Sequence, residues 1–393
     1  MDFLRLPERN FRTGRFLSKL PRWLRQRFVR LTQEVLAERM RFASTPEISR
    51  DWNRRLSQFE IRNQTTRVLS RPKRVYFEVT RKCNLRCNMC PHSFKDLDRC
   101  DIDLHLLDVI ADVLPYNEDM ALFGCGESLT TPVFMEALSR LPKDMNTRLI
   151  TNGLLLDEKV SRLLVQHQLS ALTVSVDAAK EDTYQLIHGV SKLQQVIENI
   201  ETLNRVKKEL GSELPALVLG YVLMKANLDE LPDFVRLGAR LKAASIGVGH
   251  LTVFRESLKE QSLLYDREHS NNVLEETRKL AEILGVHVHL PVPFDLSVDP
   301  WKDKFPPFSG LCPEPWEFLY VDNVGTVRPC CIHEEIVGDL HRQSFEEIWN
   351  GEPYQRFRAV VNTPKRYGLC LNCFDYRYRN SDNPEHYFLI MAP

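Results

Sequence analysis

The sequence predicts an α/β fold in which a partial (β/α)6 barrel lies between a helical, basic N-terminal arm and a small C-terminal domain. Short β-rich stretches alternate with helical stretches from Arg74 to residue 290, the pattern of a parallel sheet covered by helices. The 393-residue chain is 43% hydrophobic, which is enough for a sizeable core. Basic residues before the sheet and cysteines in two groups divide the chain into residues 1–73, 74–290 and 291–393.

The N-terminal arm is basic and has a helical pattern. Residues 1–74 contain 19 Lys and Arg against 7 Asp and Glu. Apolar residues recur among the arginines at three- and four-residue steps, at Leu20, Leu24, Phe28 and Leu31. We expect this stripe to pack on the rest of the protein or on a second copy of the chain, which would form a homodimer. Attraction to an anionic membrane or to nucleic acid is less favoured, because arginines beside aromatic residues are also common on half-buried helices.

Six β-rich stretches are expected to form parallel strands. They cover residues 75–80, 120–124, 148–151, 171–176, 217–224 and 245–251. Helical stretches lie between and after them, at residues 104–114, 133–141, 157–167, 193–210, 229–241 and 272–284. In such folds the functional residues come from loops at the carboxyl ends of the strands, so reactive groups are expected there.

The remaining sequence features indicate a linker, the cellular location and the chemical state of the cysteines. Residues 291–311 are rich in Pro and Asp and are expected to link the barrel to the last domain. No uncharged apolar run approaches the roughly 18 residues that span a bilayer, and the first residues lack the apolar core of a secretory signal. We therefore expect a cytoplasmic protein with no transmembrane segment. In that reducing compartment, ten cysteines are better explained as metal ligands or reactive thiols than as disulfides.

The first cysteine group follows the first predicted strand. Cys83, Cys87 and Cys90 have C-x3-C-x2-C spacing on a loop. Three thiolates this close can hold three irons of a 4Fe-4S cluster, which leaves the fourth iron open to a small molecule. A structural zinc site is the alternative, but it needs a fourth ligand, and the nearest candidate is His92.

This triplet resembles the one on the first-strand loop of the radical S-adenosylmethionine (SAM) superfamily, and the resemblance covers about residues 74–290. It implies that the open iron of a 4Fe-4S cluster binds SAM. Other strand ends match the family's SAM-binding elements. The matching residues are Gly124, Gly126, Glu127, Asn152, Ser175, Asp177 and His188. Two positions depart from the family pattern: His188 replaces an arginine that could pair with the SAM carboxylate, and Met89 replaces an aromatic residue that often contacts the adenine.

The second cysteine group lies in the last domain. Cys312 and Cys330 flank a predicted β-hairpin that would bring them together, and Cys370 and Cys373 form a C-x2-C pair. The arrangement resembles the SPASM/Twitch domain appended to many radical SAM enzymes. It implies a second, auxiliary 4Fe-4S cluster held by these four thiolates, in the shorter single-cluster Twitch form. A zinc ribbon is the alternative on ligand count alone.

The resemblance also implies the reaction. The open cluster delivers an electron that cleaves SAM, and the resulting 5'-deoxyadenosyl radical abstracts a hydrogen atom from the substrate. Net oxidation results if the auxiliary cluster accepts the electron of the substrate radical. Epimerisation instead needs a hydrogen donor, for which Cys100, Cys125 and Cys331 are candidates, although each is also explained as a small buried hydrophobe. His250, at the end of the sixth strand, is a candidate base.

Substrate and partners follow from the same resemblance. The first expectation is an oxidoreductase or epimerase that acts on a sugar or aminocyclitol-type alcohol in a biosynthetic pathway, with a flavodoxin- or ferredoxin-type electron donor. The alternative is radical modification of a ribosomally synthesised peptide by oxidation, epimerisation or crosslinking. A noncatalytic iron–sulfur electron carrier is a lesser alternative, because a carrier would not need the SAM-binding residues. No nucleic-acid partner is expected.

Overall fold

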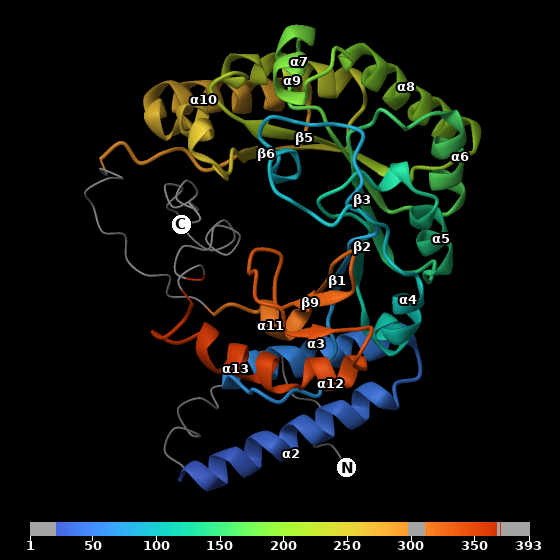
Figure 1. Ribbon diagram of the computed structural model, residues 1–393, viewed down its shortest axis with the longest axis vertical. Helices are drawn as coiled ribbons and strands as arrows, with labels where there is room; N and C mark the ends of the chain where they lie inside the picture. Colours follow the sequence, from blue (N-terminus) through green and yellow to red (C-terminus); the bar gives the residue numbers. More distant parts are fainter. Residues whose placement is uncertain (1–20, 298–310, 368–369, 371–393) are drawn as a thin grey trace.

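The computed structural model describes residues 21–297, 311–367 and 370. These residues form one curved sheet of ten strands in the order β10-β9-β8-β1-β2-β3-β4-β5-β6-β7. Figure 1 shows helices along the outer side of the curve and the N-terminal helices at one end of the molecule. The strands are β1 (Arg74–Phe77), β2 (Asp119–Ala121), β3 (Asn146–Thr151), β4 (Ala171–Ser175), β5 (Ala216–Leu223), β6 (Ser245–His250), β7 (Val288–His289), β8 (Phe318–Val321), β9 (Thr326–Arg328) and β10 (Gly338–Asp339).

The helices alternate with the strands as predicted, and the parallel α/β fold is confirmed. The helices that follow β1 to β6 are α4 (His105–Val109), α5 (Val133–Arg140), α6 (Glu158–Gln166), α7 (Glu181–His188), α8 (Leu193–Glu209), α9 (Leu231–Arg240) and α10 (Arg267–Leu284). The C-terminal domain adds α11 (Glu314–Glu317), α12 (Phe345–Trp349) and α13 (Glu352–Val361). The short helix α7 was not predicted, because eight residues give too few turns for an apolar period to show.

The two faces of the sheet have different environments. Along β5, Leu217, Leu219, Tyr221 and Leu223 are buried, while every alternate residue is only half-buried. Because side chains of a strand alternate between faces, one face lies under the helices and the other remains partly accessible. The helix α8 contributes its own buried apolar residues to the covered side. The accessible face is the inner side of the curve in Figure 1.

The sheet continues from the barrel into the C-terminal domain. Strand β8 pairs in parallel with β1, with Arg74 opposite Phe318, and β8 and β9 form the predicted antiparallel hairpin. Lys73 and Arg74 make 2.7 Å ion pairs with Glu317 and Glu314, next to the start of β8. The hairpin prediction is confirmed, but the pairing of β8 with β1 was not foreseen, since no local pattern specifies a partner strand. Part of the predicted linker, residues 298–310, lies outside the described residues.

The N-terminal arm forms α2 (Arg22–Arg41) and α3 (Pro46–Asn63). The prediction of helices holds, but Phe28 and Leu31 are 43% and 52% exposed, so these two residues do not pack on the rest of this chain. Packing of the stripe on a second copy stays a prediction. The buried face of α2 is instead the one with Ala37 and Met40, which pack against Leu56 of α3. The small side chain of Ala37 suits a close approach of two helices. Leu20 of the predicted stripe lies outside the described residues, and Leu24 is half-buried.

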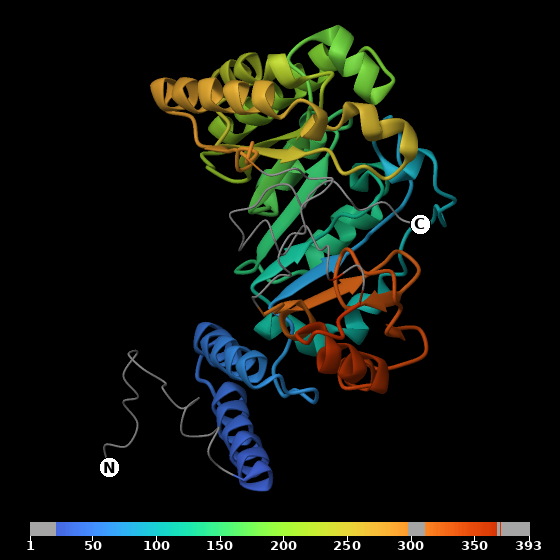
Figure 2. The same cartoon turned by 90° about the vertical axis from the view of Figure 1, so that its left-hand side faces the viewer.

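Figure 2 shows α2 and α3 together at the end of the molecule opposite to α10. Within the described residues, no helix is both long enough and apolar enough to cross a membrane.

Candidate active site

The cluster loop, residues 80–90, leaves the carboxyl end of β1 and carries the cysteine triplet. Burial raises the pKa of the Cys83, Cys87 and Cys90 thiols. The charges of Cys83 and Cys90 also contribute to the raised pKa of Cys87, which means that the three sulfur atoms lie near one another. Leu85 donates its backbone N–H to Cys83 Sγ at 3.5 Å. Buried thiols of this kind become thiolates when a metal centre supplies the compensating positive charge.

The donor set of this loop, three thiols on one short segment, fits an iron–sulfur cluster. Among the described residues, no three Cys, His, Asp or Glu side chains converge as one ion requires. A 4Fe-4S cluster spaces its ligands more widely, because each thiolate binds a different iron. The zinc alternative also needed His92, whose Nε2 lies 2.7 Å from the carbonyl oxygen of Arg81. The His92 side chain is buried, and its Nε2 is used in this contact with the backbone rather than being directed at the three cysteines as a fourth ligand.

The glycine loop, residues 124–127, follows β2 and packs directly on the cluster loop. A Cβ atom at Gly126 would lie 2.4 Å from the carbonyl oxygen of Thr80 and 2.6 Å from that of Lys82. Glu127 donates its backbone N–H to the same Lys82 oxygen at 2.8 Å. Only glycine therefore allows this approach of the two backbones. The structure brings together the two segments that the sequence assigned to SAM and to the first cluster.

The side chain of Glu127 fastens the glycine loop to the turn after β3. Its carboxylate accepts hydrogen bonds from Asn152 N–H at 2.7 Å, Thr151 Oγ1 at 2.9 Å and Leu129 N–H at 3.1 Å. Burial raises the pKa of Glu127, although these hydrogen bonds act in the opposite direction. Asn152 then reaches the cluster loop, where its Nδ2 donates to Asn84 Oδ1 at 2.8 Å. Three successive strand ends are thus connected by polar contacts.

The residues after β4 divide between the inner face and the interior. Ser175 is half-buried at the end of β4. Asp177 is buried, has a φ angle of +59°, and accepts a 2.6 Å hydrogen bond from the backbone N–H of Val222. This left-handed conformation is uncommon for a non-glycine residue and often marks a functional position. This hydrogen bond ties the Asp177 carboxylate into the fold, and its role in SAM binding stays a prediction.

His188 lies closer to the cluster loop than its family position suggested. Its ring is buried, with Nδ1 3.1 Å from Cys87 Sγ and Nε2 3.1 Å from the carbonyl oxygen of Val176. The Nε2 atom also lies 3.3 Å from Asp177 Oδ2. The arginine that many relatives carry is expected to meet the SAM carboxylate, whereas this histidine contacts a cluster ligand. His188 therefore lies beside the cluster loop, and its contact with SAM stays a prediction.

The auxiliary cysteines are partly described. Cys312, Cys330 and Cys370 are half-buried, and Cys373 lies outside the described residues. Burial raises the pKa of Cys330, and the nearby Cys312 and Cys331 add to the shift. Cys312 and Cys330 are therefore within electrostatic reach of each other, and their role as ligands of one cluster stays a prediction. The backbone N–H of His333 donates to Cys330 Sγ at 3.3 Å, a contact typical of a thiolate ligand's surroundings.

The candidate hydrogen donors and base occupy different places. Cys100, Cys125 and Cys331 are exposed, so the alternative of a buried hydrophobe does not apply to them. Asn323 donates its Nδ2 to Cys100 Sγ at 3.1 Å, which places Cys100 against the hairpin turn. Cys125 lies in the glycine loop, where desolvation by the surrounding protein raises its pKa to about 11. For His250, burial lowers the pKa to about 3, which makes it a weak base.

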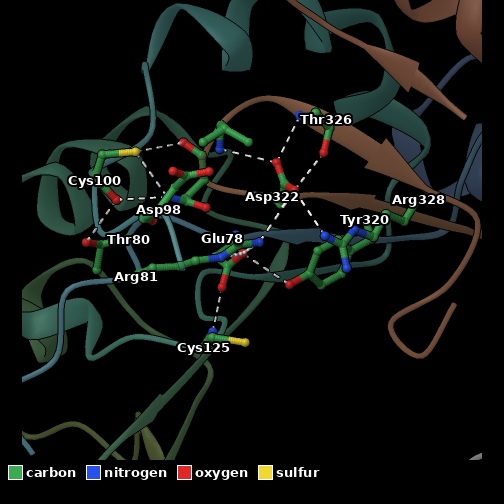
Figure 3. A network of polar contacts seen from close by, with 12 residues as sticks. Glu78, Thr80, Arg81, Asp98, Cys100, Cys125, Tyr320, Asp322, Thr326 and Arg328 are labelled. Carbon is green, nitrogen blue, oxygen red and sulfur yellow. Dashed lines mark hydrogen bonds and ion pairs between the residues drawn. The ribbon is translucent and has the colours of Figure 1, made fainter. Parts of the chain in front are cut away.

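Sequence reasoning missed a buried group of polar residues beside the site. Glu78 and Arg81 precede Cys83 and contact Tyr320 and Asp322 of the β8–β9 hairpin (Figure 3). One signal was present: Glu78 is a carboxylate at the end of a strand of apolar residues, where a charge requires a partner.

Comparison with known proteins agrees with this architecture. Residues 77–238 match the radical SAM superfamily, and residues 312–374 match the SPASM iron–sulfur cluster-binding domain. The chain is a radical SAM enzyme with a C-terminal SPASM domain. The radical SAM domain implies SAM and a 4Fe-4S cluster as cofactors, and the SPASM domain implies additional iron–sulfur clusters.

Individual relatives are distant in sequence. The chain is 23% identical to the tungsten-containing aldehyde ferredoxin oxidoreductase cofactor-modifying protein of Pyrococcus furiosus, over 77% of this chain and 87% of that protein. It is 24% identical to the PqqA peptide cyclase of Granulibacter bethesdensis, over 77% and 79%. Among solved structures, Streptococcus suis SuiB bound to its precursor peptide SuiA has a TM-score of 0.55 at 14% identity, covering 80% of this chain and 71% of that one. At 17% identity, anSMEcpe with bound AdoMet has a TM-score of 0.56, covering 80% and 93%.

Proposed function

We propose that this enzyme uses SAM-derived radical chemistry to modify a ribosomally synthesised peptide. When bound, SAM and the reduced cluster supply a 5'-deoxyadenosyl radical that removes a hydrogen atom from the substrate. Support for a peptide comes from the PqqA peptide cyclase and from SuiB, which is solved with its precursor peptide. None of the relatives described above is named for a sugar or aminocyclitol substrate, so the first expectation from the sequence has less support than its alternative.

The observation that carries this proposal is the accessible inner face of the sheet. Inward positions near the carboxyl ends of β4 to β6 have small side chains, including Ser175, Gly220 and Gly249. A Cβ atom added at Gly247 or Gly249 would meet no other described atom within 4 Å. Glycine in a strand often marks a place where a ligand or another backbone comes close. This surface belongs to the same sheet as β1, from which the cluster loop leaves. A peptide substrate could therefore bind on it, close to the site where the radical forms.

Within this proposal each group of residues has a role. Cys83, Cys87 and Cys90 hold the open cluster, while Cys312, Cys330, Cys370 and Cys373 hold a closed auxiliary cluster. The glycine loop and the turns after β3 and β4 bind SAM. Cys125 and Cys331 remain the candidate hydrogen donors if the product is an epimer, and the closed cluster is the electron acceptor if the product is oxidised or crosslinked.

Four further expectations belong to the same proposal. The electron donor is a flavodoxin- or ferredoxin-type protein, because the open cluster must be reduced before SAM is cleaved. The enzyme works in the cytoplasm, where thiols remain available for clusters. The domain boundaries stay at residues 73 and 290, and both matched domains fall inside them. A homodimer through the arm would use the exposed side of α2.

The test is an anaerobic incubation of the reconstituted enzyme with SAM and a reductant. One reaction receives short peptides encoded beside its gene, a second receives aminocyclitols and sugars, and a third receives neither. Mass spectrometry of a peptide product is expected to show loss of two hydrogens, a crosslink, or an unchanged mass with solvent deuterium incorporated. Turnover of a small alcohol with no change in any peptide would overturn the proposal. A carrier protein would release no 5'-deoxyadenosine in any of the three reactions.

A further inference from the structure

A buried polar network lies between the two domains (Figure 3). It consists of Glu78 and Arg81 from the barrel and Tyr320, Asp322 and Arg328 from the β8–β9 hairpin. Strands β1 and β8 are parallel neighbours, so their carboxyl ends lie at the same edge of the sheet. Glu78 extends this pairing by donating its backbone N–H to the Val321 carbonyl oxygen at 2.9 Å. The network therefore forms where the cluster loop and the hairpin turn begin.

Glu78 is the shared acceptor of this network. Its side chain is fully buried, and its Oε1 accepts a 2.5 Å hydrogen bond from the backbone N–H of Cys125 in the glycine loop. Its Oε2 accepts from Arg81 Nε at 3.0 Å and from the Tyr320 hydroxyl at 3.2 Å. A Cβ atom at Gly124 would lie 2.2 Å from the same carboxylate. One side chain thus contacts the glycine loop, the cluster loop and the auxiliary hairpin.

Arg81 and Asp322 continue the contact into the second domain. The Arg81 guanidinium lies 2.9 Å from Glu78 Oε2 and 3.4 Å from Asp322 Oδ2. Asp322 also shapes the hairpin turn, because it accepts hydrogen bonds from the Val324 and Thr326 backbone N–H groups and from the Thr326 hydroxyl. Arg328 adds a second cation at 3.6 Å from Asp322.

The charges of the network compensate one another. Two carboxylates face two guanidinium groups in a region where Glu78, Arg81 and Asp322 are all buried. Burial alone would lower the pKa of Arg81, but the neighbouring Glu78 carboxylate raises it above its ordinary value. A buried charge that loses its partner is costly, so each member depends on the positions of the others. If the hairpin turn moves, Arg81 loses its contact with Asp322. The side chains of Arg81 and Glu78 then have to move as well to keep their charges paired.

We propose that Glu78, Arg81, Tyr320 and Asp322 are positioning residues through which the SPASM domain orders the SAM-binding glycine loop. The path runs from Asp322 to Arg81, from Arg81 to Glu78 and from Glu78 to the backbone N–H of Cys125. None of these residues needs to touch SAM or iron. The proposal rests on the assignment of residues 124–127 to SAM, and it predicts that a change in the hairpin alters SAM binding in the other domain.

The test compares Asp322→Asn with a matched control, Asp339→Asn. Both changes remove one carboxylate charge from the C-terminal domain. The Asp339 carboxylate accepts from His341 N–H at 2.9 Å and lies 3.3 Å from Arg342, two residues that are not part of the network. For reconstituted full-length Asp322→Asn, the dissociation constant for SAM is expected to rise about tenfold, which corresponds to about 1.4 kcal/mol. The control is expected to bind SAM as the unchanged protein does. Equal SAM binding by both variants would overturn the proposal.

A second readout separates loop order from SAM chemistry. Amide hydrogen exchange of residues 124–127 is measured in the full chain without SAM, and exchange at Cys125 is expected to be at least several-fold faster in Asp322→Asn. This result is expected even if residues 124–127 bind something other than SAM. The experiment therefore tests the path from Asp322 to Cys125 separately from the assignment of residues 124–127 to SAM. Arg81→Lys, which keeps the charge, is expected to restore part of the protection that Arg81→Gln loses. Unchanged exchange at Cys125 in Asp322→Asn would refute the path.

Tyr320→Phe covers the outcome in which Asp322→Asn does not fold. It removes only the hydroxyl that donates to Glu78 and keeps the ring packed beside Tyr76. Exchange at Cys125 is expected to rise in this variant as well, by a smaller factor, with iron content unchanged. Protection equal to that of the unchanged protein would count against the network.

Discussion

The three thiols of the cluster loop give the most direct prediction for single residues. Anaerobic reconstitution of the full chain is expected to give about eight irons, as two 4Fe-4S clusters require. Changing Cys83, Cys87 and Cys90 together to alanine is expected to leave about four, because the other four ligands lie in the C-terminal domain. Iron and acid-labile sulfide analysis measures both values. The visible absorbance that makes iron–sulfur proteins brown gives an independent measure of cluster content.

The matched control changes Cys100 to alanine, a cysteine outside both ligand sets. That variant should retain all of its iron, since the described contacts of the Cys100 thiol are with Asn323 of the hairpin turn. Zinc without iron at the C-terminal cysteines would contradict the auxiliary-cluster assignment and restore the zinc-ribbon alternative.

His250 gives a prediction about pH. Its pKa in the folded protein is about 3, below the ordinary value of about 6.5 that it has when unfolded. The unfolded chain therefore binds a proton first as the pH falls, so the His250 contribution is complete above pH 7 and is lost below it. Between pH 7 and 5.5 this loss amounts to about 1 kcal/mol. His250→Gln should remove that part of the pH dependence in anaerobic thermal unfolding.

Exposed His105 provides the comparison for this measurement. Its side chain is 72% exposed beside Asp108. His105→Gln makes the same substitution at an exposed position and serves as the matched control. If His250→Gln and His105→Gln give the same slope, burial does not control the protonation of His250.

The candidate site shows which residues a sequence can reveal. Cys83, Cys87 and Cys90 were found because their side-chain type and spacing already define the chemistry. Arg81 and Asp322 were missed because their contact joins residues 241 positions apart. The contact of His188 with Cys87 depends on how α7 packs, and that helix of eight residues is too short to show an apolar period. Chemistry carried by local spacing is predictable, whereas partners across a domain boundary are not.

At the scale of elements, strand order was harder to predict than strand position. All six predicted barrel strands are present within a few residues, because alternating burial leaves a pattern in the sequence. The arm shows the limit of such patterns. Its helix α2 has one apolar stripe with Phe28 and Leu31 and another buried face with Ala37 and Met40, and periodicity alone cannot say which face meets α3.

Deletions in the arm are predicted to have two different outcomes. Removal of residues 1–44 should give a folded protein, because α2 contacts the rest mainly through α3. Removal of residues 1–72 should cause aggregation, since it also takes away α3 and the segment that follows it. That segment accepts hydrogen bonds from Trp316 at Thr65 and from Trp349 at Ser70. Size-exclusion chromatography and thermal unfolding of the two deletions test this difference.

A soluble and active deletion of residues 1–72 would contradict the structural role of α3. The deletion of residues 1–44 also tests the homodimer. Removing the exposed side of α2 should convert a dimer to a monomer if the two copies meet there. Sedimentation with anionic vesicles at low and high salt distinguishes the membrane alternative, because attraction between exposed charges and lipid weakens as salt rises.

At the scale of the whole molecule, the two iron–sulfur domains share one sheet. β1 forms backbone hydrogen bonds with β2 on one side and with β8 on the other. Without the C-terminal domain, β1 would become an edge strand with unpaired backbone groups, and such edges promote aggregation. Lys73 and Arg74, whose side chains are only 15% and 19% exposed, would also lose their carboxylate partners.

A chain that ends at residue 311 lacks β8 and therefore exposes this edge of β1. Such a chain retains the whole cysteine triplet, yet it is expected to aggregate or to hold less than one cluster, and to release no 5'-deoxyadenosine. Full-length Cys373→Ala is the control, because it removes one auxiliary ligand and leaves β8 paired with β1. This variant should stay folded and cleave SAM while forming little product, since the substrate electron then lacks its acceptor. A truncated chain that is monomeric and cleaves SAM at the full-length rate would show that the shared sheet is dispensable and that the barrel folds as an independent unit.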